Sequence, residues 1–312
     1  MADIIEALPV TPGVYRFRDA SGRVVYIGRA TDLRRRVASY WGPLDDRPHL
    51  RRMVAQVTRV EALPCASAHE AAWLERNLLE TSKPRWNRVR GGLEVPTYVT
   101  LRTGPSAARL AVTHQPEHQA GTTRSFGPYL GGTRSRLAVA GLERALGLAY
   151  TADQLGGFDR DMARVRGVTA AQRTEHAALA AAVLGGDADA LAHVVGLLVA
   201  RRDEASAALA FEMAARIQSE VAALTWIAAP QRVTVDAGAD SPDRQLAGWS
   251  DGVLVLLTLR RGRVDRWQQR PLPQARAAPL VAGTPRDWAP ALAEAARLAA
   301  ALRDAALPAR RR

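Results

Sequence analysis

The sequence predicts an α+β protein in which a small antiparallel sheet near the N-terminus precedes a long helical region and a short α/β segment. Residues 13–18 and 23–28 are rich in β-branched and aromatic residues and flank the turn-prone stretch DASGR, which is typical of a hairpin. Residues 150–227 are almost entirely helix-forming and alanine-rich. After Pro230 the pattern returns to apolar strands and ends in an alanine-rich helix over 286–305.

The N-terminal sheet is expected to have three strands, because residues 58–64 (TRVEALP) read as a further strand after the hairpin. If the hairpin is symmetric, Tyr15 lies opposite Tyr26 and Gly13 lies opposite Gly28. Opposed residues of an antiparallel pair share one face of the sheet. The two tyrosines are therefore expected on the same side.

Helices are expected to flank this sheet. Thr31 or Asp32 is a suitable N-cap for a helix directly after the hairpin. Following that cap, Arg36 and Tyr40 are four residues apart, so they lie on one helical stripe. A second, short helix is predicted over residues 48–57.

The next predicted helix carries a carboxylate in an unusual place. Ser67 and Glu70 have the S-x-x-E spacing of a capping box, and Lys83-Pro84 would end the helix. His69, beside the cap, is expected at the surface. Glu75 falls between apolar positions of the buried stripe. Because a buried unpaired carboxylate is costly, we expect a cation, a metal or a hydrogen-bond donor next to it.

The whole chain is expected to divide into four segments. The first holds the three-stranded antiparallel sheet and its flanking helices, the second linker strands and a helix, the third helices with a helical hairpin, and the fourth a truncated α/β fold. Within the second, residues 96–102 and 107–113 read as strands and 125–134 (SFGPYLGGTR) as a loop. In order, the segments are residues 1–95, 96–150, 151–228 with the hairpin at 198–226, and 229–312.

The charge favours a polyanionic partner. The formal net charge is +12, which points to nucleic acid or another polyanion. A single cysteine, Cys65, excludes an intramolecular disulfide framework and any four-cysteine metal site, so a reducing cytoplasm is the expected location. No run approaches the about 18–20 apolar residues that a membrane-spanning helix needs.

Several short motifs occur in a fixed order. GVY at 13–15 and YIG at 26–28 are followed by Arg36 and Tyr40, and then by EAAWLERNLLETSKPRWN at 70–87. This series resembles the GIY-YIG nuclease family and, within it, the UvrC-like and Cho-like excision-repair endonucleases. The later SFGPYLGG also looks like the UvrC group. The resemblance covers roughly residues 10–235.

The resemblance implies a DNA endonuclease that hydrolyses a phosphodiester with one divalent cation, Mg²⁺ or Mn²⁺, held by Glu75. One carboxylate suffices, because Mg²⁺ keeps several waters. The attacking water would be activated by the metal or by a tyrosine, and which tyrosine acts as the base stays open. Tyr26 fits this role if nearby positive charge lowers its pKa from about 10. The residues implied in catalysis are Tyr15, Tyr26, Arg29, Arg36, Tyr40 and Asn87, with Gly13 and Gly28 allowing close approach.

The same resemblance implies partners. Arg34 and Arg35 are expected either to contact damaged duplex DNA or to form a solvated helix face. The segment 198–224 is similar to the UVR helical hairpin that binds UvrB, with Leu209, Phe211, Glu212 and Ala215 as the expected contact residues. The expected function is nicking of one strand, on the 3′ side of a lesion, in UvrB-dependent nucleotide excision repair. Two alternative functions stay open: a catalytically inactive adaptor that binds DNA or UvrB, and a GIY-YIG nuclease of another DNA-processing pathway.

Three features depart from the pattern of the family. Arg29 stands where the family often has lysine, which keeps the charge and alters the geometry. Residues 155–170 lack the cysteine cluster of many UvrC proteins. About 85 residues follow the hairpin, too few for a second, RNase H-like nuclease and its DNA-binding modules. We therefore expect one incision only.

Overall fold

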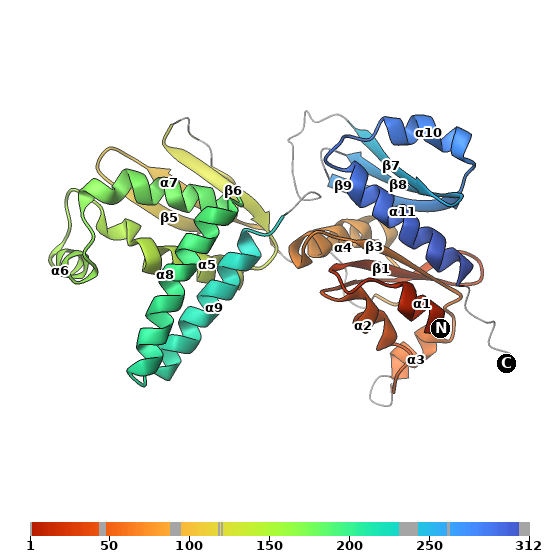
Figure 1. Ribbon diagram of the computed structural model, residues 1–312, viewed down its shortest axis with the longest axis horizontal. Helices are drawn as coiled ribbons and strands as arrows, with labels where there is room; N and C mark the ends of the chain where they lie inside the picture. The colour runs from red at the N-terminus through yellow and green to blue at the C-terminus, as the bar shows by residue number, and fades with distance from the viewer. Residues whose placement is uncertain are drawn as a thin grey trace. The chain divides into compact units, whose positions relative to one another are not determined.

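The computed structural model describes residues 2–43, 48–87, 95–117, 119, 121–230, 243–260 and 263–305. The chain forms two compact units (Figure 1). Unit 1 combines Met1–Leu93 with Pro230–Arg312, and unit 2 is Glu94–Ala229. The second and third expected segments thus share unit 2, and the first and fourth share unit 1. The division into four segments stays a prediction.

The first sheet of unit 1 has three antiparallel strands, as predicted. They are β1 (Gly13–Arg18), β2 (Val24–Ala30) and β3 (Arg59–Pro64). Their order is β2-β1-β3, so β1 is the central strand. The α+β fold class is confirmed.

The register of the hairpin differs from the symmetric one. Tyr15 pairs with Gly28, and Tyr26 pairs with Phe17. A β-bulge follows Phe17, and the Asp19 side chain organises the turn by accepting backbone N–H groups two and four residues on. These local features shift the pairing by two residues, so the predicted pairing of the tyrosines was wrong. A shift of two keeps both tyrosines on one face, as expected.

In the part of unit 1 that the structure describes, four helices border this sheet, of which α2, α3 and α4 are predicted from the sequence and α1 is not. They are α1 (Ala2–Ala7), α2 (Leu33–Ala38), α3 (Pro48–Val54) and α4 (Ala68–Ser82). Asp32 caps α2 and Ser67 caps α4, each through its side-chain oxygen. Glu70 accepts the N–H of Ala66 instead of completing a capping box. His69 is fully buried, so its predicted surface position was wrong.

The C-terminal part of unit 1 is a second antiparallel sheet with two helices. Its elements are β7 (Arg244–Ser250), β8 (Val253–Arg260), β9 (Arg263–Pro271), α10 (Gln274–Ala282) and α11 (Ala289–Asp304). The strand order is β7-β8-β9. The sequence pattern predicts neither β7 nor α10. The stretch QRVTVDA at 231–237, which also reads as a strand in the sequence, lies outside the described residues. At Gly248 the backbone of β7 approaches α11 so closely that a Cβ atom would overlap the Leu292 carbonyl.

One apolar cluster joins the two parts of unit 1. Leu298 and Leu302 of α11 belong to the same buried cluster as Tyr15 and Phe17 of β1 and Val60 of β3. The C-terminal segment therefore contributes to the core beneath the first sheet.

Unit 2 consists of a third antiparallel sheet and a group of helices (Figure 1). The sheet has the order β5-β4-β6. Its elements are β4 (Thr97–Thr103), β5 (Ala108–Thr113), β6 (Thr123–Tyr129), α5 (Gly132–Leu146), η1 (Leu148–Tyr150), α6 (Gly157–Arg166), η2 (Ala170–Gln172), α7 (Arg173–Leu184), α8 (Ala188–Ala207) and α9 (Phe211–Ile227).

Residues 125–129 belong to strand β6, so the loop predicted over 125–134 was wrong at its first half. Pro128 and Gly127 favour a loop in a sequence pattern. β6 is an edge strand, however, and an edge tolerates a proline because one side of the strand needs no N–H donor.

Helices α8 and α9 pack against each other over the region where a helical hairpin is expected at 198–226, and α8 begins ten residues earlier than that range. Glu220 of α9 is fully buried and accepts two hydrogen bonds from Arg144 of α5, at 2.6 and 2.9 Å. Gly141 of α5 faces Glu220 without a side chain, and a Cβ atom there would lie 3.2 Å from that of Glu220. This contact fixes the hairpin to the rest of unit 2.

Within the described residues, no single helix is long and apolar enough to span a membrane. The helical stretches Ala170–Leu184 and Ala188–Ala207, bent by 111° at their junction, meet that requirement only when taken together.

Candidate active site

Three tyrosines and one arginine form a continuous chain of hydrogen bonds in unit 1. The Tyr15 and Tyr40 hydroxyl oxygens are 2.7 Å apart. The Tyr40 hydroxyl donates to that of Tyr26 at 3.2 Å, and Arg36 Nε donates to the Tyr15 hydroxyl at 3.2 Å. We call Tyr15, Tyr26, Tyr40 and Arg36 the tyrosine chain. All four are predicted from the sequence motifs, and the fold brings them together from β1, β2 and the α2 region.

The donors of the tyrosine chain point in one direction. Arg36 can only donate, so the Tyr15 oxygen accepts from it. Because Tyr40 donates to Tyr26, its oxygen is left to accept the proton of Tyr15. The series therefore runs from Arg36 through Tyr15 and Tyr40 to Tyr26. The Tyr26 hydroxyl accepts within this series and stands at its end.

Burial separates the roles of the tyrosines. Tyr15 is fully buried and Tyr40 nearly so, whereas Tyr26 is half-buried. Burial, and then the neighbouring phenols, raise the pKa of Tyr15 well above its usual value, and burial likewise raises the pKa of Tyr40. Both stay protonated at neutral pH. The lowered pKa that base catalysis requires is therefore not found at Tyr15 or Tyr40.

Burial alone would lower the pKa of Arg36, but its interactions with Tyr15, including their hydrogen bond, raise it above its usual value. Arg36 thus stays cationic at the head of the tyrosine chain. Its guanidinium carbon also lies 5.2 Å from the ring centroid of Tyr40.

The rings pack tightly around Gly28 and Phe17. A Cβ atom at Gly28 would lie 2.6 Å from Tyr15 Cζ and 2.9 Å from Tyr26 Cε1. Gly28 thus makes room for the rings of Tyr15 and Tyr26. Phe17 lies 5.1 Å from Tyr40, centroid to centroid, and is a site neighbour that the motif search missed. Strand alternation, which puts residues 15 and 17 on one face, is the signal that could have found it.

Gly13, the other predicted structural glycine, lies at the beginning of β1. A Cβ atom there would lie 2.6 Å from both Leu33 Cδ1 and the Leu63 carbonyl oxygen. It allows α2 and β3 to approach β1.

Glu75 forms an ion pair with Arg29. Glu75 Oε2 lies 3.4 Å from Arg29 Nε, and the side chains are 20% and 41% exposed, respectively. Arg29 is thus a cation of the kind expected beside this carboxylate. The described residues contain no group of three or more His, Cys, Asp or Glu side chains that could hold a metal. A single, partly exposed carboxylate nevertheless suits Mg²⁺, which prefers oxygen ligands and retains waters.

Asn87 grips the backbone of β2. Its Oδ1 accepts the Ile27 N–H at 3.0 Å, and its Nδ2 donates to the Ile27 carbonyl at 2.7 Å. The preceding residue, Trp86, donates its N–H to the Val25 carbonyl at 3.1 Å. Residues 86 and 87 therefore run along the edge of β2 in the way that a further strand would. Asn87 holds the strand that carries Tyr26 and Gly28.

The predicted DNA-binding arginines of α2 differ in their surroundings. Arg34 Nε donates to the Leu8 carbonyl at 2.7 Å, and Arg34 Nη2 donates to the Glu6 carbonyl at 3.1 Å. A phosphate contact of Arg34 would have to share the guanidinium with these carbonyls. Arg35 is exposed, and its backbone N–H completes the cap of α2 with Asp32.

The predicted partner-binding residues gather at the turn of the α8–α9 hairpin. Leu209 is 74% exposed and Phe211 is 62% exposed, and Met213 beside them is 43% exposed. Glu212 and Ala215 are also exposed. Leu209 has a φ of 60°, in the left-handed region, which closes the turn between the helices. Exposed apolar side chains grouped at one turn are typical of a contact surface.

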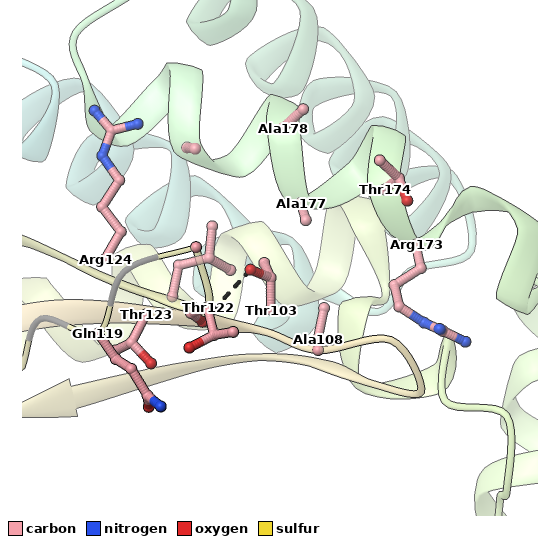
Figure 2. Close-up of a pocket in the computed structure, with 14 residues that line it drawn as sticks. Thr103, Ala108, Gln119, Thr122, Thr123, Arg124, Arg173, Thr174, Ala177 and Ala178 are labelled. Atoms are coloured by element: carbon pink, nitrogen blue, oxygen red, sulfur yellow. Dashed lines mark hydrogen bonds between the residues drawn. The ribbon is translucent and has the colours of Figure 1, made fainter.

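Unit 2 also contains a cavity of about 590 Å³ between its sheet and α7 (Figure 2). Ala177 and Ala178 of α7 face Thr103 and Ala108 of the sheet across it. The guanidinium of Arg173, at its border, is engaged by the Thr151 carbonyl and Asp153. None of the predicted site residues lines this cavity.

Comparison with known proteins identifies the N-terminal part of the chain. The family model described as a UvrC-like GIY-YIG domain matches residues 11–88. UvrABC system protein C of Trichlorobacter lovleyi is 33% identical over 150 residues, which cover 48% of this chain and 24% of the relative. The same protein of Gloeobacter violaceus is 29% identical over 264 residues, covering 82% and 42%.

A third relative, from Mycobacterium tuberculosis, is named for bifunctional exonuclease/endonuclease activity and is 33% identical over 191 residues, covering 58% of this chain and 29% of the relative. The chain thus spans less than half the length of these relatives. Among solved structures, the magnesium-bound GIY-YIG N-terminal endonuclease domain of UvrC from Thermotoga maritima is 31% identical and covers 28% of this chain and 93% of its own, with a TM-score of 0.26.

Proposed function

We propose that this chain, whose residues 11–88 form a UvrC-like GIY-YIG domain, is a metal-dependent DNA endonuclease that nicks one strand. The observation that carries the proposal is the tyrosine chain, which leads from Arg36 to the half-buried hydroxyl of Tyr26. Glu75 is held beside the strand of Tyr26 by Arg29. These groups are suited to phosphodiester hydrolysis.

Tyr26 is the proposed general base. When its hydroxyl loses a proton to the solvent side, the phenolate oxygen still accepts the hydrogen bond of Tyr40. Tyr40 in turn accepts from Tyr15, and Tyr15 accepts from the cationic Arg36. Tyr26 is the most exposed of the three tyrosines, and its phenolate would keep the hydrogen bond from Tyr40. The phenolate would take a proton from the attacking water.

Glu75 is the proposed metal ligand. A divalent cation bound there would supply Lewis-acid stabilisation of the charge on the phosphate. Binding would require Arg29 to turn away from Glu75, and the 41% exposure of its side chain leaves room for that movement. Arg29 and Arg36 are both exposed in part and would bind phosphate oxygens as charge develops on them.

DNA is the proposed substrate. A net charge of +12 favours the phosphate backbone, and Arg35 is an exposed cation on α2. Such contacts weaken steeply as salt rises, because each neutralised phosphate releases counterions. They carry no sequence information, so we assign the choice of lesion to partners.

The proposed pathway is UvrB-dependent nucleotide excision repair in the cytoplasm, with one nick on the 3′ side of a lesion. Two of the relatives described above are named UvrABC system protein C, which supports this assignment. The exposed Leu209 and Phe211 of the α8–α9 hairpin are the proposed contact with a UvrB-like protein. The relative named for exonuclease and endonuclease activity supports a second candidate, a nuclease of a different DNA-processing pathway.

The test is strand cleavage of an end-labelled duplex with one bulky lesion, with Mg²⁺ or Mn²⁺, in the presence and absence of UvrB. Wild type is compared with Glu75→Ala and Tyr26→Phe. A metal-dependent nick 3′ to the lesion, lost in both variants and dependent on UvrB, supports the proposal. Cleavage that depends on neither the lesion nor UvrB would indicate a nuclease of another DNA-processing pathway. Binding of DNA or UvrB without cleavage under any condition would instead indicate an inactive adaptor.

A further inference from the structure

We propose that the C-terminal sheet is a working part of the nuclease unit, and that Arg16 and Trp267 are positioning residues that fix β1 and thereby Tyr15. The kinetic part of its test rests on the proposed nuclease function, whereas its structural part does not. The inference comes from the face of β1 opposite the tyrosine chain. Alternation along the strand places Tyr15 on one face and Arg16 on the other.

Arg16 is bound from two sides. Its side chain is buried, and its Nε donates to Glu61 of β3. Its Nη1 donates to the Trp267 carbonyl of β9 at 2.7 Å. The guanidinium carbon lies 4.0 Å from the centroid of the Trp267 ring. One cation of the catalytic strand is thus held both by its own sheet and by the C-terminal sheet, 251 residues away in sequence.

The buried cation of Arg16 has an anionic partner, Glu61, inside the protein. Glu61 is buried and also interacts with Arg18 at 2.9 Å and Arg59 at 2.7 Å. Burial alone would raise the pKa of Glu61, but the three arginines lower it below its usual value. Burial lowers the pKa of Arg16 to about 10, so it remains cationic at neutral pH. A buried cation held in this way tolerates little displacement, because each movement leaves a charged donor without its partner.

Other contacts place the C-terminal segment against the same sheet. The Thr81 hydroxyl of α4 donates to the Asp265 carbonyl of β9 at 3.2 Å. Leu298 and Leu302 of α11 share the buried cluster of Tyr15. Ser67, the cap of α4, donates its hydroxyl to the Pro230 carbonyl at 2.7 Å, where the chain returns to unit 1. Movement of β9 would therefore be transmitted to β1 and to α4, which carries Glu75.

A second tryptophan of the C-terminal sheet offers a matched control. Trp249 of β7 donates its ring N–H to the Leu272 carbonyl at 2.7 Å. It packs against the cluster of Ala247, Leu254, Leu256 and Ala277, which includes residues of the sheet and α10. It supports the C-terminal sheet and is not part of the Arg16–Trp267 contact.

The experiment uses the full chain with Trp267→Ala, Trp267→Phe and Trp249→Ala. Amide hydrogen exchange of the peptides covering β1 is measured first, at a temperature at which each variant retains its wild-type circular dichroism. Nicking kinetics are measured under the same conditions, with kcat and KM determined separately. If Trp267→Ala does not fold, Trp267→Phe and Trp267→Leu replace it, because both fill most of the space and only the phenylalanine keeps a ring over Arg16.

We expect Trp267→Ala to speed amide hydrogen exchange across β1 by about tenfold. We also expect it to lower kcat by about tenfold or more with little change in KM, because a misplacement of a catalytic group by about 1 Å can slow a reaction about 100-fold. Trp267→Phe should recover most of both. Trp249→Ala should change neither. Equal effects of Trp267→Ala and Trp249→Ala, or unchanged exchange of β1 in Trp267→Ala and Trp267→Leu, would overturn the proposal. If the wild-type protein does not nick DNA at all, the hydrogen-exchange measurement alone tests whether Trp267 fixes the position of β1.

Discussion

The hydroxyl oxygens of Tyr15 and Tyr40 lie 2.7 Å apart, inside a group of aromatic rings that excludes most solvent. Neither tyrosine is suited to accept a proton from water, because burial raises the pKa of each. Their shared hydrogen bond instead connects the cation of Arg36 to the half-buried Tyr26. Two of the three tyrosines would thus act through the third.

Tyr40→Phe tests that connection. The variant keeps the ring and removes the hydrogen bond to Tyr26, so we expect kcat to fall by about 10- to 100-fold, within the range of general-base effects. Tyr150→Phe, in unit 2, is the control and should match wild type. A wild-type kcat in Tyr40→Phe would show that the connection plays no part.

Asn87→Asp tests the grip on β2. The aspartate keeps an acceptor for the Ile27 N–H but sets a carboxylate oxygen against the Ile27 carbonyl. We expect a loss of about 1–3 kcal/mol in the free energy of unfolding, the cost of leaving a buried polar group unpaired. Urea denaturation measures it. Gln56→Ala, which removes one exposed amide bonded to the Arg52 carbonyl, should cost far less. Equal losses in the two variants would contradict the assigned role.

Alkaline pH tests the burial of the phenols. The pKa of Tyr15 is raised in the folded state above the value of about 10 of an unfolded chain. Its contribution to stability is therefore complete below about pH 10 and is lost as the pH rises through the folded pKa. The urea midpoint should fall above pH 10, and less steeply in Tyr15→Phe. Identical slopes for wild type and variant would argue against a buried, neutral Tyr15.

Phe211→Ser tests the hairpin as a contact surface. Phe211 is 62% exposed, so the change should leave the thermal unfolding midpoint within error and weaken binding to immobilised UvrB by about tenfold or more, as loss of an aromatic anchor does. Phe158→Ser on α6 is the matched control, because Phe158 is 75% exposed and lies outside the hairpin. If both variants bind as wild type does, the hairpin turn is not the contact.

Local signals in the sequence predicted most of the first sheet and its helices. The side chains of Asp32 and Ser67 accept backbone N–H groups three residues further along the chain, so these helix caps could be recognised from the sequence. The motif order likewise predicted the members of the tyrosine chain. The pairing of Tyr15 with Gly28 could not be predicted, because a bulge after Phe17 shifts the register. The Arg16–Trp267 contact joins residues 251 positions apart in the sequence. It could not be predicted, because the periodicity of a sequence reports only on neighbouring residues.

Metal-dependent nicking by a variant of Glu75 is the most direct test of the central claim. Glu75→Gln keeps the size of the side chain and removes its charge, and Glu80→Gln on the same helix is the control, since Glu80 is exposed and paired with Arg76. The rate of nicking of a labelled duplex is measured against Mg²⁺ concentration. We expect Glu75→Gln to lose at least about 100-fold in rate while still binding DNA, in keeping with the loss of metal-ion catalysis, and Glu80→Gln to follow wild type. Wild-type rates in Glu75→Gln at every Mg²⁺ concentration would contradict the account.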